Sequence, residues 1–124
     1  MLVARAPGGA TVDHPVAQTV RVGGRVVASA TPAPVPPQLA RKAQRLAAFY
    51  AGRLALEGIL AVELFVLDDG RLVVNEMVPG PHPAFDDAPL GTVDQYAQLV
   101  RAVTGHAPRT VPPGRRAARR MRAG

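Results

Sequence analysis

The chain alternates between short apolar runs typical of strands and two stretches in which apolar residues recur at helical spacing. The clearest strand pattern is AVELFVLDDGRLVVNEM at residues 61–77, where two runs rich in Val and Leu flank Asp69-Gly70. Asp-Gly between apolar runs predicts a two-residue hairpin loop, because both turn positions need a positive φ. This loop predicts a register in which Glu63 lies directly opposite Glu76.

Further strands are predicted before this hairpin, over residues 2–6, 11–22 and 25–30. Pairs of glycines join them, and Pro15 interrupts the second strand because proline cannot donate to the sheet ladder. The pattern assigns no second partner to residues 2–6. We therefore expect this strand to form an exposed edge that favours association with another chain.

Two amphipathic helices complete the predicted elements. The first is predicted from Pro37, where a missing N–H costs nothing, to Gly58 as a left-handed cap. The second is predicted to start at a capping box formed by Thr92 and Gln95 and to end at Gly105. Together the patterns indicate an α+β fold, an antiparallel sheet with two packed helices.

The remaining segments are a loop and a tail. Residues 78–91 (VPGPHPAFDDAPLG) are too rich in Pro and Gly for regular structure, and a loop of this length in a small domain is often functional. It carries His82, which could reach a metal ion or a substrate. Residues 106–124 have no periodic apolar face, so we predict a domain over 1–105 and a disordered basic tail over 106–124.

Composition narrows the chemistry. The chain has no cysteine and a single serine, Ser29, which excludes disulfides, thiolate metal sites and nucleophilic serine or cysteine catalysis. The net charge is +6, but the nine acidic residues all lie in residues 1–108 with nine basic ones, so the excess is confined to the arginines of the tail. The N-terminus has no signal-peptide pattern, and we expect a soluble, cytoplasmic protein with no membrane partner.

Glu63 and Glu76 are the candidate chemical site. Opposed side chains in a ladder lie roughly 4.5 to 5.5 Å apart, and like charges there repel. The two carboxylates would share either a proton or a divalent cation, and Asn75 beside Glu76 favours the cation, although strict alternation would point Asn75 to the other face. If the register slipped by one residue, Glu63 would face Asn75 and both acids would be solvated strand ends.

Four segments carry a resemblance to a known family. They are LVARAPGGATVDHPV (2–16), VPPQLARKAQRLA (35–47), GILAVELFVLDDGRLVVNEMVPGPH (58–82) and QYAQLVRAVTG (95–105). In this order and spacing the chain resembles the ATP-grasp enzymes, and among them the N5-carboxyaminoimidazole ribonucleotide synthases, also called phosphoribosylaminoimidazole carboxylase ATPase subunits. The resemblance covers the C-terminal half of the ATP-grasp core, and it implies a partial ATP-grasp domain.

The resemblance also implies a site and a reaction. Glu63 and Glu76 match the glutamates that bind nucleotide-bound Mg²⁺, with Asn75 as a further metal contact, His82 as a substrate or anion contact, and Mn²⁺ as a substitute ion. The implied partners are ATP, bicarbonate and aminoimidazole ribonucleotide. The aminoimidazole ribonucleotide would be carboxylated through carboxyphosphate, as a step of purine biosynthesis. Gly80 stands where the family has an arginine, and Pro83, Ala84 and Phe85 replace a polar loop.

These departures and the short coverage predict a truncated or degenerate ligase that is poorly active alone. Two other functions remain open from the sequence. One is a non-catalytic module that needs a homo-oligomer or a partner chain to supply the missing half. The other, which we favour least, is nucleic-acid binding through the arginines of residues 115–122.

Overall fold

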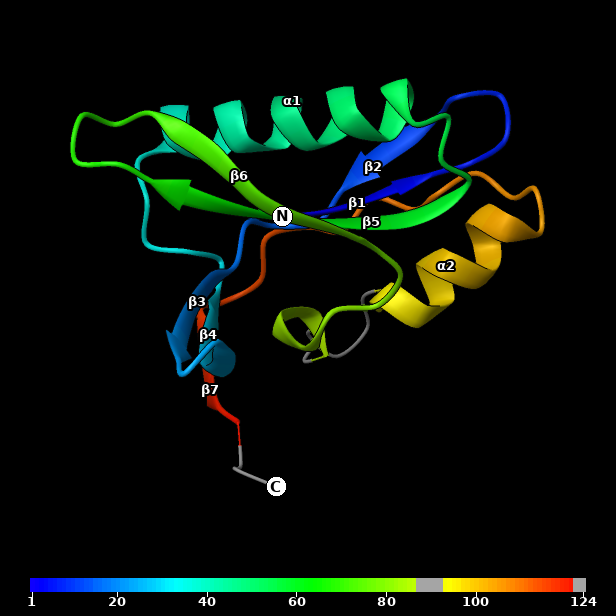
Figure 1. Ribbon diagram of the computed structural model, residues 1–124. Helices are drawn as coiled ribbons and strands as arrows, with labels where there is room; N and C mark the ends of the chain where they lie inside the picture. Colours follow the sequence, from blue (N-terminus) through cyan, green and yellow to red (C-terminus); the bar gives the residue numbers. More distant parts are fainter. Residues whose placement is uncertain (87–92, 122–124) are drawn as a thin grey trace.

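The computed structural model describes residues 1–86 and 93–121 and confirms the α+β class (Figure 1). Within these ranges the strands form a four-stranded sheet in the order β2-β1-β5-β6 and a three-stranded sheet in the order β3-β4-β7, with antiparallel neighbours throughout. The elements are β1 Leu2–Arg5, β2 Thr11–Asp13, β3 Gln18–Val22, β4 Arg25–Thr31, α1 Pro37–Arg53, β5 Gly58–Val66, β6 Leu72–Pro79, η1 Pro83–Phe85, α2 Gln95–Val103 and β7 Ala117–Arg120.

Strand β1 lies inside the four-stranded sheet, so the prediction of an exposed edge at residues 2–6 is wrong. It pairs with β2 on one side and with β5 on the other, where Leu2 lies opposite Ala61. Leu2, Val3 and Ala4 are fully buried, so both faces of the strand are covered. The partner β5 is distant in the sequence, and no local pattern reveals such a pairing.

Helical segments cover both faces of the four-stranded sheet (Figure 1). On one face α1 packs its small residues against the sheet, which allows the helix to approach closely. The buried residues there are Met1, Val3, Ala43, Ala47, Ala51, Leu60 and Val62. The other face packs on η1 and, through Leu99, on α2, and its buried residues are Leu2, Ala4, Ile59, Ala61, Ala84 and Phe85. No helix within the described ranges has the length and apolar character needed to cross a membrane.

The helix ends differ from the predicted ones. Helix α1 ends at Arg53, and Ala55 takes the left-handed conformation with φ 48°. Gly58 instead begins β5, where it pairs with Arg5, and its φ of 135° lies in a region that favours glycine. At α2 the Asp94 side chain caps the helix by accepting a hydrogen bond of 2.7 Å from the N–H of Ala97. The predicted cap residue Thr92 lies outside the described residues.

Part of the predicted disordered tail is a strand. Residues 117–120 form β7, which pairs with β4 so that Thr31 lies opposite Ala117 and Ala28 lies opposite Arg120. All four β7 residues are exposed. Backbone pairing along a free edge needs no apolar periodicity, so the composition of the tail carries no signal for this strand.

Candidate functional site

The β5–β6 hairpin places Glu63 opposite Glu76, as predicted, but by a different route. The loop has three residues rather than two, since the Leu67 N–H donates to the Arg71 carbonyl (2.9 Å) and Gly70 takes φ 80°. This shifts the pairing by one residue near the loop. A β-bulge beside Glu63 then shifts it back, so the two departures cancel at the glutamate pair.

Asn75 is the residue left unpaired at this bulge. A bulge disturbs the strict alternation of side chains. The Asn75 amide consequently lies on the same side as Glu63, and its Nδ2 donates to Glu63 Oε1 over 2.7 Å. The alternation rule would point Asn75 away from the carboxylates, and the bulge brings it to them.

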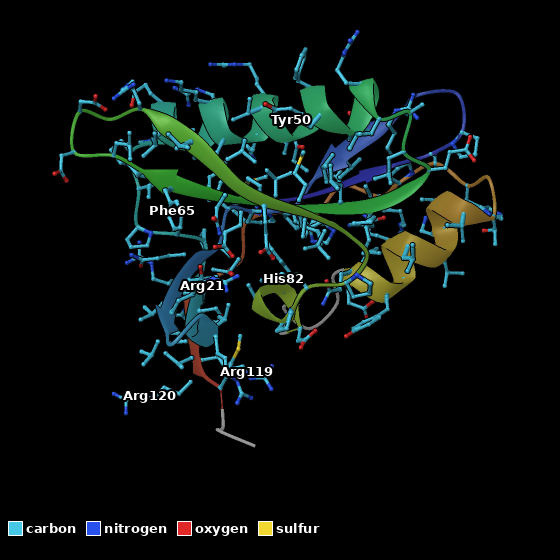
Figure 2. All side chains as sticks on the ribbon, in the orientation of Figure 1. Arg21, Tyr50, Phe65, His82, Arg119 and Arg120 are labelled. Atoms are coloured by element: carbon cyan, nitrogen blue, oxygen red, sulfur yellow. The ribbon has the colours of Figure 1, made fainter. Side chains whose placement is uncertain are left out.

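Arg21 on β3 completes the cluster, and no sequence pattern points to it. Glu63 Oε2 accepts hydrogen bonds from Arg21 Nε (3.0 Å) and from Arg21 Nη2. The same Nη2 lies 4.0 Å from Glu76 Oε1. Both carboxylates therefore face one guanidinium, on one side of the hairpin, and Figure 2 shows Arg21 beneath that hairpin. From the sequence, a shared proton or a shared metal ion could make the proximity of the two carboxylates tolerable. The structure adds a third possibility, the positive charge of an arginine from the second sheet.

The electrostatics favour ionised Glu63. Burial alone would raise the pKa of Glu63, but hydrogen bonds from Arg21 and Asn75 and the charge of Arg21 outweigh it, so the pKa is lowered. A lowered carboxyl pKa contributes stability that is present above the unfolded-state pKa and lost as the pH falls through the folded-state value. The Glu63 side chain is 12% exposed and that of Glu76 is 49% exposed, so Glu76 is the carboxylate open to an incoming ligand.

His82 lies at the same site. Its Nδ1 accepts a hydrogen bond of 3.2 Å from the Ala84 N–H, which assigns the proton of the neutral ring to Nε2. Burial is the main cause that lowers its pKa, so the ring is neutral near pH 7. The buried Gln95 side chain holds the His82 backbone from both sides, accepting from its N–H (2.8 Å) and donating to its carbonyl (3.1 Å). The sequence pattern assigns Gln95 to a helix cap, and the structure gives it this positioning role.

These residues border a cavity of about 350 Å³ among β3, α1, β5, β6 and η1. Its polar wall contains four of the residues described above: Arg21, Glu63, Glu76 and His82. The remaining wall is largely apolar, with Val16, Leu39, Leu64, Leu72, Val78 and Phe85 among its residues. An apolar cavity with a few convergent polar groups is typical of small-ligand sites.

The donor set suits a magnesium ion that is shared with a ligand. In the part of the chain that the structure describes, no three His, Cys, Asp or Glu side chains converge as a closed metal site. Mg²⁺ commonly takes one or two carboxylates from the protein and fills its other positions with water and substrate phosphates. Glu63 and Glu76, with the Asn75 amide oxygen after rotation of that group, fit this pattern.

Comparison with known proteins gives the class first. A family model described as the ATP-grasp domain matches residues 1–84. The chain therefore belongs to the ATP-grasp family, in agreement with the resemblance found in its sequence.

Individual relatives narrow the class. The chain is 45% identical over 107 residues to the N5-carboxyaminoimidazole ribonucleotide synthase of Mycobacterium tuberculosis, covering 82% of this chain and 24% of that protein. The same enzyme of Bacillus subtilis is 36% identical over 106 residues, covering 85% and 28%. A solved ADP complex of N5-carboxyaminoimidazole ribonucleotide synthetase superposes with a TM-score of 0.89 at 30% identity, covering 94% of this chain and 31% of that one. The chain thus spans about a quarter of the length of its curated relatives.

Proposed function

We propose that this chain is the metal- and phosphate-binding part of an ATP-grasp ligase that carboxylates aminoimidazole ribonucleotide with bicarbonate. The observation that carries the proposal is the pair of carboxylates on one side of the β5–β6 hairpin at the rim of the cavity. The relatives named for this reaction match the chain over the same hairpin, and one of them is a complex with ADP.

In this proposal Glu63, Glu76 and Asn75 would hold the Mg²⁺ that accompanies ATP. A bound Mg²⁺ supplies positive charge where the transferred phosphoryl group becomes more negative. The chain's own contribution is position, because both carboxylates come from paired strands whose backbone is fixed by the sheet. The apolar wall of the cavity would exclude water from one side of the charged groups once a ligand fills it, and so would strengthen their interactions.

His82 is proposed to contact a substrate or anion. Its neutral ring carries the donor Nε2–H, and two hydrogen bonds with Gln95, one accepted and one donated by the Gln95 amide, keep its backbone in place. Gly80 offers no side chain for the charge that the family's arginine would supply at that position. A neutral donor without the family's arginine at position 80 would bind an anionic intermediate less tightly, which supports low activity for this form of the site.

The test measures binding of Mg·ADP to the 124-residue chain by isothermal titration calorimetry. Because the chain spans about a quarter of its relatives' length, binding is a more direct readout than turnover. We expect Glu76→Gln to weaken Mg·ADP about tenfold or more, since a carboxylate that ligates a metal is replaced by a neutral amide. Glu76 is half exposed, so this variant should fold normally.

A matched control comes from the same hairpin. Asp69 in the loop is exposed and bonds to Arg71 rather than to the cavity. Asp69→Asn removes one negative charge at a distance from the pair and should leave the affinity for Mg·ADP unchanged. Equal affinities of the unmodified chain and Glu76→Gln would contradict the assignment of the pair to the nucleotide's metal ion.

A further inference from the structure

Arg21 is held in place by contacts on two sides. Its Nη1 donates to the Gly24 carbonyl at the adjoining turn, and its Nε and Nη2 donate to Glu63. The pairing of β3 with β4 shifts register between Val20 and Arg21, because Val27 of β4 has no pairing partner on β3. The Arg21 side chain is 28% exposed. Arg21 from β3 and Asn75 from the bulge of β6 thus bond to the same carboxylate, and Figure 2 shows Arg21 below the β5–β6 hairpin.

The guanidinium lies where a divalent cation would have to lie. Glu63 Oε2 accepts two N–H groups of Arg21, and Glu63 Oε1 accepts the Asn75 amide, so both oxygens are engaged. Mg²⁺ needs oxygen ligands at roughly 2.0 to 2.1 Å, which is too close to admit these donors as well. A divalent ion that binds Glu63 Oε2, the oxygen that accepts from Arg21, therefore has to displace Arg21 from it.

We propose that Arg21 is an exchangeable counter-ion, which neutralises Glu63 in the free chain and moves to the nucleotide's phosphates when the metal–nucleotide complex binds. The inference rests on the proposed function and adds a role for a residue of β3. The planar fork of arginine binds phosphate oxygens as well as carboxylate oxygens, so the guanidinium has a second partner of the same geometry. Free metal offers it no such partner.

The exchange predicts selectivity. When a bare divalent ion binds, Arg21 is released into a site that has gained positive charge, and the ion pair with Glu63 is lost without replacement. When the ion arrives with a polyphosphate, the phosphate charge takes the place of Glu63 as the partner of Arg21. The chain should therefore bind free metal poorly and metal–nucleotide complex well.

The experiment measures free Mn²⁺ by electron paramagnetic resonance, with and without ADP. We expect Arg21→Gln to bind free Mn²⁺ about tenfold more tightly than the unmodified chain, because a charge-assisted competitor is gone. The same variant should bind Mn·ADP about tenfold more weakly, because a phosphate contact is gone. Arg21→Lys keeps the positive charge but loses the planar guanidinium. Its affinities for free Mn²⁺ and for Mn·ADP should lie between those of the unmodified chain and those of Arg21→Gln.

The matched control is Arg25→Gln. Arg25 is an exposed arginine at the start of β4, on the same hairpin as Arg21. This substitution removes the same charge and should leave both affinities unchanged. Thermal melting by circular dichroism of each variant reports whether the fold is intact.

The outcomes separate this inference from the function it rests on. If Arg21→Gln and the unmodified chain bind free Mn²⁺ equally, while Glu63→Gln abolishes binding, the exchange is wrong and the carboxylate site stands. If no variant that melts like the unmodified chain binds Mn²⁺ or Mn·ADP, both are wrong. If Arg21→Gln loses both ligands together with a lowered Tm, Arg21 is a structural residue, and the exchange is overturned.

Discussion

The two sheets differ in how they are covered. The four-stranded sheet has helical segments on both faces, and strands β1 and β5 contribute its fully buried residues. The three-stranded sheet leaves Val20 50% exposed and Val22 65% exposed, and it lies apart from α1 (Figure 1). Yet this second sheet supplies Arg21 to the carboxylate pair. The first sheet thus provides stability, and the junction of the two provides the polar site.

The largest expected effect is a cavity in the covered sheet. Leu60 is 1% exposed and packs in the core beneath α1. We expect Leu60→Ala to lower the free energy of unfolding by roughly 3 to 4 kcal/mol, because the loss of buried methyl groups adds to the cost of the cavity. The control Val22→Ala, on the uncovered sheet, should change it by less than about 0.5 kcal/mol. Urea denaturation measures both, and similar losses would remove the contrast between the sheets.

A second effect concerns His14, in the segment that connects the two sheets. The ring is buried, and within the described ranges its Nε2 has no hydrogen-bond partner. Burial lowers its pKa to about 4, although the charge of Asp94 acts in the opposite direction. The unfolded chain therefore binds a proton at a pH where the folded chain does not, and stability rises with pH between about 4 and 6.5.

The expected loss of stability from this group on going from pH 7 to pH 4 is roughly 2 to 3 kcal/mol. His14→Phe removes the titrating group and keeps an aromatic ring beside Phe85, whose centroid lies 6.2 Å away. Denaturant melts across this pH range should show a smaller acid-induced loss in the variant. Parallel curves for the two proteins would show that His14 does not titrate differently on folding.

A smaller effect is expected at Gly58, which begins β5. Its φ of 135° is unfavourable for other residues, and a Cβ there would lie 3.3 Å from Leu99 Cδ1. We expect Gly58→Ala to lower the free energy of unfolding by about 1 to 3 kcal/mol. Gly52 in α1 has open space where a Cβ would lie, and Gly52→Ala should raise stability by about 0.5 to 1 kcal/mol. If both substitutions changed the free energy of unfolding in the same direction, backbone conformation would not explain the effect at Gly58.

The smallest effect is expected at the edge of the uncovered sheet. Removal of residues 114–124 takes away β7, whose side chains are exposed and whose Arg119 lies 4.0 Å from Asp86. We expect a loss of less than about 1 kcal/mol, since exposed ion pairs contribute little. Thermal melting of the shortened chain is the measurement. A loss as large as that of Leu60→Ala would mean that β7 stabilises the whole molecule.

Local sequence signals predict the local structure well, and they predict part of the polar cluster of Glu63, Glu76, Asn75 and Arg21. The glycine pairs and the apolar runs of residues 61–77 predict the hairpins correctly, and the predicted pairing of Glu63 with Glu76 is met because the longer loop and the bulge cancel. The bulge at Asn75 could not be predicted from the local pattern. The longer loop and the bulge offset one another, so a register without either gives the same partner for Glu63. The role of Arg21 could not be predicted from local pattern either, since its contact with Glu63 joins residues 42 positions apart.

Turn chemistry, hydrophobic period and motif spacing are properties of neighbouring residues, so the hairpins, the helical segments and the family can be predicted from the chain before it is folded. Three features become visible only in the folded molecule: β1 lies inside its sheet, β7 joins β4, and Arg21 reaches the glutamates. The first two depend on strand edges that meet through packing, and the third on a side chain that reaches from one sheet to the other. An edge selects its partner by position in the folded chain rather than by composition.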